Sequence, residues 1–177
     1  INREGIVKSG ISFSTSSAVQ SQLVQIPVNP TYCAFSSYGG WAPTPLGHIS
    51  ILHTLWRGSL VYKLYVPANR FVRGKLRIAY IPQPNYAINY ADLTQNALSV
   101  VLDLSQSSTV ELSVPYTATE TYLPVNAYNN DTIRQNYSNN GFIAVFVEQA
   151  LYIPAASGAL AMFMTVRSGD DFELQVP

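Results

Sequence analysis

The chain has 177 residues and a formal net charge of zero; 11% of its residues are charged, 47% are apolar and 12% are aromatic. A disordered chain needs low hydrophobicity and high net charge, so this composition excludes disorder for most of the length. Zero net charge also excludes binding of nucleic acid through a positive field around the whole molecule.

The first half of the chain reads mainly as β-strands. Apolar and polar residues alternate over residues 10–16 and 21–30, which is the period of a half-buried strand. Residues 31–45 are polar, contain Gly and Pro, and predict a loop. Two more alternating runs, 59–67 and 74–82, each end in proline, which removes a donor from a sheet ladder. We therefore expect four strands before residue 83.

One segment of this half has helical periodicity instead. Apolar residues within Pro45–Leu55 are spaced by three and four, and proline suits the first turn of a helix. The pattern predicts a short amphipathic helix over Pro45–Leu55, and residues 91–97 predict a further helical turn. The predicted face of the helix consists of Leu46, Ile49, Leu52 and His53.

The second half supplies four more strand signals. Two are separated by a polar turn, and two long ones close the chain around a turn at residues 155–158. Between the pairs, residues 119–141 are rich in Asn and Tyr without periodicity and predict a long loop, which in a compact domain is usually functional. The four strand segments are residues 98–105, 108–116, 141–154 and 158–177.

These segments define the expected fold class. About eight strands, with no alternation of strands and helices and no internal repeat, favour an all-β protein. The natural architecture is an eight-stranded antiparallel jelly-roll sandwich with one or two short helices in its loops. We expect residues 1–177 to form a single domain.

The charges are divided unevenly along the chain. Residues 1–91 contain eight bases and one acid, and residues 92–177 contain two bases and nine acids, so their formal charges are +7 and −7. No linker separates the halves, so we expect strands from both to interleave in one body and pair basic with acidic segments. The alternative is a basic face that binds RNA or an acidic partner.

Residues suited to catalysis or metal binding are scarce. The chain has two histidines, His48 and His53, and one cysteine, Cys33, and it lacks the His-x-His pair of jelly-roll metalloenzymes. It also lacks a nucleophile elbow, a Walker loop and a dinucleotide fingerprint. We therefore predict no catalytic residue, no metal site and no cofactor, and hence a protein that is not an enzyme.

Targeting signals are also missing from the sequence. A lone cysteine excludes an internal disulfide and fits a reducing compartment, and no run approaches the length of a membrane-spanning helix. The chain starts at Ile1 without an initiator Met, so we expect either a trimmed chain or one cut from a larger precursor. A surface this poor in charge is typical of a protein that buries much of its outside against partners.

Four short motifs occur in order along residues 45–177. They are a W-x-G-x-L strand, a G-x-L-x-I strand, a V-P-Y strand end and a terminal G-x-D-F. In this order they resemble the capsid proteins of picorna-like positive-strand RNA viruses, with a lean toward dicistrovirus and iflavirus subunits. The motif residues are Trp56, Arg57, Gly58, Leu60, Gly74, Pro115, Tyr116, Gly169, Asp170, Asp171 and Phe172.

The resemblance implies a fold and a function. The family's jelly roll has sheets lettered BIDG and CHEF, which would place the strand Leu160–Arg167 beside Ser59–Val66 and bring Asp170, Asp171 and Glu173 near Arg57. It implies a polyprotein-derived subunit that assembles with related subunits, in the host cytoplasm, into an icosahedral virion. That virion would enclose genomic RNA and mediate host-cell attachment and entry. No basic arm precedes the barrel, so the chain is not expected to hold RNA through such an arm.

Three alternatives stay open at this point. Asp170-Asp171-Phe172 resembles a motif suggested to drive autocatalytic cleavage of insect-virus capsid precursors, whereas the simpler interpretation is a strand-end turn that caps backbone amides and pairs with Arg57 or Lys63. A jelly-roll lectin could stack sugars on Tyr38, Trp41 and the Tyr-rich loop from Tyr116 to Tyr137. A cupin-like enzyme is disfavoured because metal ligands are missing.

Overall fold

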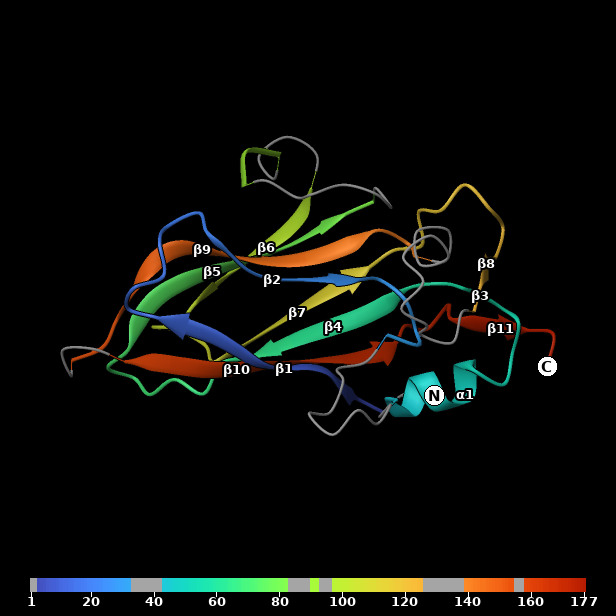
Figure 1. The fold of residues 1–177 in the computed structure, drawn as a ribbon, viewed down its shortest axis with the longest axis horizontal. Helices are drawn as coiled ribbons and strands as arrows, with labels where there is room; N and C mark the ends of the chain where they lie inside the picture. The colour runs from blue at the N-terminus through green and yellow to red at the C-terminus, as the bar shows by residue number, and fades with distance from the viewer. Residues whose placement is uncertain (1–2, 33–42, 83–89, 93–96, 126–138, 155–157) are drawn as a thin grey trace.

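Alternating apolar residues place the strands of this protein in facing sheets. The structure, a computed structural model, describes residues 3–32, 43–82, 90–92, 97–125, 139–154 and 158–177. Within these ranges the strands run side by side along the long axis of the molecule, and a smaller group of strands lies at one end with helix α1 (Figure 1). The loops predicted for residues 31–45 and 119–141 lie largely outside the described residues.

Two four-stranded antiparallel sheets form the sandwich. The first has the order β1-β10-β4-β7 and the second β2-β9-β5-β6, which are the BIDG and CHEF orders of a jelly roll. The predicted neighbourhood of the last long strand and the strand after residue 59 is confirmed, since β10 pairs with β4 in antiparallel register. The strands are β1 (Gly5–Ser14), β2 (Gln22–Pro27), β4 (Leu60–Tyr65), β5 (Arg73–Ile81), β6 (Leu98–Asp103), β7 (Thr109–Val114), β9 (Phe142–Tyr152) and β10 (Ala159–Ser168).

A third, three-stranded sheet was not predicted. Its order is β11-β3-β8, with β3 at Leu55–Arg57, β8 at Leu123–Pro124 and β11 at Glu173–Gln175. Strand β8 lies inside the segment predicted as a loop, and β11 is separated from β10 by a turn rather than continuing it. Strands of two or three residues are too short for alternation to reveal, so the sequence pattern missed them.

The predicted helix is shorter than expected. Helix α1 spans Pro45–Ser50, with the Thr44 hydroxyl accepting from the Gly47 N–H at 3.0 Å as N-cap. The prediction of a helix to Leu55 is wrong, because Leu55 begins β3 and pairs in the small sheet. Of the predicted apolar face only Leu46 is in the core, and Leu52 is 69% exposed.

Two other parts of the helix predictions can be compared with the structure. His53 lies beyond the end of α1, and its Nδ1 atom is 3.0 Å from the Ile49 carbonyl oxygen. In the other predicted helical turn, the described part is a 3-10 turn, η1, at Tyr90–Asp92.

The core lies between the two four-stranded sheets. Alternate residues of each strand point inward, as the period of two requires, and each fully buried aliphatic or aromatic side chain contributes roughly 1.5–3 kcal/mol. Strands from both halves of the chain contribute to this layer. Its members include Phe13, Ile26, Tyr62, Leu64, Leu76, Ile78, Leu112, Val145, Met162 and Met164.

Ion pairs join the two oppositely charged halves of the sequence. Arg77 Nε is 2.8 Å from Glu148 Oε2 across β5 and β9, and Lys75 Nζ is 3.3 Å from Asp103 Oδ2 across β5 and β6. Hydrogen bonds from Arg77 and Tyr90 hold the pKa of Glu148 below its ordinary value. The interleaving predicted from the charge pattern is therefore confirmed.

Candidate functional site

Most of the motif residues meet at one end of the sandwich. We call these residues the motif cluster. They lie where β10 ends and the small sheet begins, at the end of the molecule that carries β3, β8 and β11 (Figure 1). Residues far apart in sequence are brought together there because β4 pairs with both β10 and β7, and β3 pairs with β11. Its members are Trp56, Arg57, Gly58, Leu60, Pro115, Tyr116, Gly169, Asp170, Asp171 and Phe172.

Three aromatic rings form the centre of the motif cluster. Trp56 on β3 is fully buried, and its ring stacks on Phe172 with centroids 6.1 Å apart and an interplanar angle of 29°. Tyr116 meets the same indole edge to face at 5.8 Å and 87°. The indole N–H finds no hydrogen-bond partner among the described residues. Aromatic pairs of this kind add roughly 0.5–1.5 kcal/mol beyond burial, so this end is held by packing.

Two glycines allow the chain segments to touch. Gly58 has φ +105°, and a Cβ there would lie 2.6 Å from the Phe172 Cα atom. A Cβ on Gly169 would overlap the Ser59 hydroxyl, and the Gly169 N–H already donates to the Ser59 carbonyl at 2.9 Å. The motif requires glycine at these positions because backbone lies against backbone.

Asp171 caps the start of β4. Its Oδ1 atom accepts from the Ser59 N–H at 2.9 Å and from the Ser59 hydroxyl through a short hydrogen bond. These bonds stabilise the carboxylate, so the pKa of Asp171 lies below its ordinary value. The expected cap of backbone amides is present. The expected ion partner differs, because Arg57 pairs with Glu173 instead, with Nε and Oε2 3.6 Å apart.

The outer side of the motif cluster is a polar layer over the small sheet. The Arg57 guanidinium lies 5.4 Å from the centre of the Tyr122 ring, and the Tyr122 hydroxyl donates to Glu173 at 3.3 Å. Gln175 Nε2 donates to the same hydroxyl at 2.6 Å. Asp170 is exposed and makes no hydrogen bond or ion pair with the part of the chain that the structure describes. Its carboxylate is thus exposed to solvent without a partner among the described residues.

The side-chain amide of Asn140 holds the end of β7 in place. The Pro115 carbonyl accepts from Asn140 Nδ2 at 2.7 Å, and Asn140 Oδ1 accepts from the Thr117 N–H at 2.9 Å. The Tyr116 hydroxyl donates to the Glu120 carbonyl at 2.9 Å, and burial raises the pKa of Tyr116. These bonds hold Tyr116 edge-on to the Trp56 ring.

Not every motif residue belongs to this end. Gly74 lies at the opposite end of β5, where its carbonyl accepts from the Leu104 N–H at 3.1 Å. Leu60 is the first residue of β4, and its side chain is buried in the core next to the rest of the motif cluster. Cys33, Tyr38 and Trp41 lie outside the described residues.

Sequence reasoning missed several members of this site. Ser59 was seen only as a filler in the first motif, although it is the residue that Asp171 caps. Asn140 and Tyr122 lie in the segment assigned to a loop; Tyr122 was considered only as part of a Tyr-rich loop that could stack sugars, and no pattern marked Asn140. A signal was available only for Ser59, since a hydroxyl residue after a glycine at a strand start often accepts or donates a cap.

Chemical machinery is not found in the described part of the chain. There, no three His, Cys, Asp or Glu side chains gather as a metal site would require. Among the described residues, none of the helices has the length and apolar character needed to cross a bilayer. The geometry of the motif cluster is one of interlocking and capping rather than of nucleophile, base and oxyanion donors.

Comparison with known proteins agrees with this architecture. Residues 11–147 match the family model of the picornavirus capsid protein. The genome polyprotein of Ljunganvirus 1 is 30% identical over 128 residues, which are 72% of this chain and 5% of that polyprotein. Black queen cell virus has a solved chain with a TM-score of 0.84 at 20% identity, covering 99% of this chain and 72% of the other. For deformed wing virus, a honeybee pathogen, the TM-score is 0.83 at 25% identity, with 99% and 46% covered.

The fold is therefore the jelly roll of viral capsid subunits. The chain belongs to the picornavirus capsid protein family and is thus a structural subunit of a picorna-like capsid. The resemblance seen in the motifs is confirmed, and the comparisons give no support to the lectin alternative. The chain spans about 5% of the length of the first curated relatives, which are whole polyproteins.

Proposed function

We propose that residues 1–177 act as one domain that assembles with related subunits of the same polyprotein into an icosahedral shell around genomic RNA. The strand order β1-β10-β4-β7 and β2-β9-β5-β6 carries this proposal, because it is a jelly-roll sandwich in a chain of the capsid protein family. The shell would form in the host cytoplasm, present its loops to the host cell and mediate attachment and entry.

We propose that the motif cluster serves assembly by shaping one end of the subunit. The packed rings of Trp56, Phe172 and Tyr116 fix this end, so the surface offered to a neighbour is pre-organised. Asp170 stands at that surface with its carboxylate unpaired by the described residues. It supports a contact with a basic or amide group of a neighbouring subunit. A cleavage role for Asp170 and Asp171 is not needed to explain their positions.

The test is to co-express this chain with its sister capsid chains and the viral protease and to analyse the product by sedimentation and electron microscopy. We expect spherical particles of megadalton size that contain RNA and more than one related chain. A chain that remains a stable monomer of 19.4 kDa in the presence of its sister chains would contradict the proposal.

Asp170 is tested in the same system with Asp170→Asn. We expect lower particle yield with unchanged unfolding of the free subunit, because the side chain is exposed and contacts no polar partner among the residues that the structure describes. Particle yield equal to that of the wild type would remove Asp170 from the assembly surface.

A further inference from the structure

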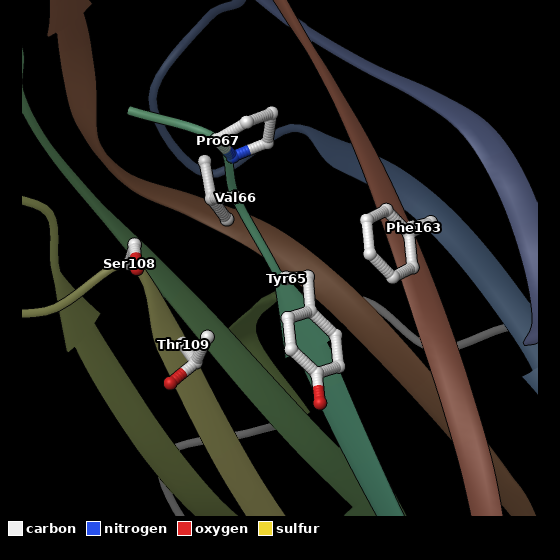
Figure 2. Close-up of a pocket in the computed structure, with 6 residues that line it drawn as sticks. All are labelled: Tyr65, Val66, Pro67, Ser108, Thr109 and Phe163. Carbon is white, nitrogen blue, oxygen red and sulfur yellow. The ribbon is translucent and has the colours of Figure 1, made fainter. Parts of the chain in front are cut away.

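The outer face of the β1-β10-β4-β7 sheet carries a hollow that lies outside the motif cluster. It has a volume of about 130 Å³ and is lined by Tyr65, Val66, Pro67, Ser108, Thr109 and Phe163. Figure 2 shows Tyr65 between Phe163 on one side and Thr109 on the other, with Pro67 at one end. The hollow therefore spans three adjacent strands, β10, β4 and β7.

The strand register explains how the hollow arises. Phe163, Tyr65 and Thr109 are direct cross-strand partners, so their side chains stand in one row on the outer face. The Tyr65 and Phe163 rings stack almost parallel, with an interplanar angle of 8° and centroids 4.8 Å apart. The Thr109 side chain is much shorter than its two neighbours, so the surface of the sheet is lower over β7. The result is a shallow apolar site with a rigid aromatic wall.

The next rows of the same face contain charges that neutralise one another. Lys63 is the cross-strand partner of Glu111, and Arg167 Nη2 lies 2.9 Å from Glu111 Oε1. Glu4 accepts from the Tyr65 hydroxyl at 2.9 Å and from Thr165 at 3.3 Å. The pKa of Lys63 is raised by the Tyr65 hydroxyl first and by Glu4 and Glu111 in addition. The formal charges of Lys63, Arg167, Glu4 and Glu111 sum to zero, so covering these four side chains together brings no net charge into an interface.

Size and charge together select the occupant. Pockets for cofactors and drug-sized ligands have volumes of roughly 300–1,000 Å³, whereas an apolar cavity of about 150 Å³ holds a single benzene ring. The neutral surroundings give no attraction for a polyanion such as RNA or a sulfated sugar. Aromatic walls around a shallow apolar site are typical of the energetic centre of a protein interface.

We propose that this hollow receives one apolar or aromatic side chain from a neighbouring capsid subunit, and that this contact buries the hollow and its rim in the shell. The inference rests on the proposed function, because a neighbour exists only if the chain assembles. It adds to that function the place and the chemistry of one contact.

Two matched variants test the hollow. Thr109→Arg fills it from β7, and Ser113→Arg adds the same side chain on the same strand and face, two rows away beside Val61. Both are co-expressed with the sister chains, and each free subunit is first checked by thermal unfolding. We expect Thr109→Arg to unfold like the wild type but to yield at least about ten-fold fewer particles, while Ser113→Arg stays within about two-fold.

Normal assembly of Thr109→Arg, or equal loss in both variants, would overturn the hollow as an anchor point. If the wild-type chain itself fails to form particles, the proposed function fails, which is a different result from a wild type that assembles beside an unaffected Thr109→Arg.

A second measurement does not depend on how Thr109→Arg folds. Ser108 is exposed at the rim of the hollow, so p-benzoylphenylalanine can replace it without entering the core. Irradiation of assembled particles should cross-link this position to another capsid chain. A cross-link to RNA, or none in intact particles, would overturn the proposal.

Discussion

At the scale of single residues, two neighbouring aspartates have opposite roles. Asp171 is tied to Ser59 by two hydrogen bonds, whereas Asp170 is exposed without a partner among the described residues. A charge-assisted hydrogen bond is stronger than a neutral one, and losing it leaves the Ser59 amide with a poorer acceptor. The sequence motif treats the two residues alike, and the structure separates them.

We expect Asp171→Asn to lower the free energy of unfolding by about 1 kcal/mol, since an amide oxygen accepts the Ser59 bonds less strongly than a carboxylate. Asp170→Asn is the matched control and should change it by less than about 0.5 kcal/mol. Urea unfolding of the free subunits measures both. Equal effects of the two substitutions would show that the cap contributes nothing.

The Asp171 carboxylate also makes the difference in unfolding free energy between the wild type and Asp171→Asn depend on pH. The pKa of Asp171 is lowered in the folded state, so its stabilisation is present above the unfolded pKa of about 3.9 and disappears as pH falls through the lower folded value. We expect wild type and Asp171→Asn to differ fully at pH 7 and to converge below about pH 4. Unfolding curves at pH 7, 5, 4 and 3 would show this, and a gap that widens in acid would contradict it.

At the scale of elements, alternation located the eight long strands but not the short ones. Strand β1 begins at Gly5, earlier than its most regular stretch, because the register shifts between Lys8 and Ile11 break the alternation. Strands β3, β8 and β11 exist only because three distant segments meet, and local sequence does not contain that information. The helix was predicted too long for the same reason, since Leu55 is drawn into the small sheet.

An element-scale prediction concerns the link between β9 and its neighbours. Glu148 accepts from Arg77 Nε at 2.8 Å, from Arg77 Nη2 at 3.0 Å and from the Tyr90 hydroxyl at 2.7 Å, and its side chain is 24% exposed. We expect Glu148→Gln to destabilise the subunit by about 1–3 kcal/mol, because it leaves a half-buried guanidinium without its counter-ion.

The control for this prediction is Glu111→Gln, whose side chain is 45% exposed. Exposed ion pairs contribute between zero and about 1 kcal/mol, so its effect should be the smaller of the two. Urea midpoints of both variants, measured at equal ionic strength, decide the order, and a larger effect at Glu111 would contradict the assignment.

At the scale of the whole molecule, the charge asymmetry of the sequence predicted interleaving correctly. Arg57, Lys75 and Arg77 of the first half pair with Glu173, Asp103 and Glu148 of the second. The motif cluster was predictable only through its resemblance to a family, because composition and periodicity carry no information about glycine contacts such as Gly169 on Ser59. The hollow on the outer face was not predictable at all, since it depends on cross-strand register.

Interleaving leads to a prediction for the whole chain. Strand β1 pairs with β10 and β5 pairs with β9, so neither half of the sequence owns a complete sheet. We expect one cooperative unfolding transition, with coincident curves by far-UV circular dichroism and tryptophan fluorescence. Two separated transitions would show that residues 1–177 contain more than one unit.

The interlock of Gly58 and Ser59 with the segment 169–172 also bears on the order of events during translation. The ribosome delivers β3 and the start of β4 long before the segment that caps them, and domains fold from the N-terminal side during synthesis. The stacking of Trp56 on Phe172 therefore cannot form until Phe172, which follows β10 in the sequence, has been synthesised. Closure of this end is therefore a late event in synthesis, because it requires residues 169–172 near the end of the sequence.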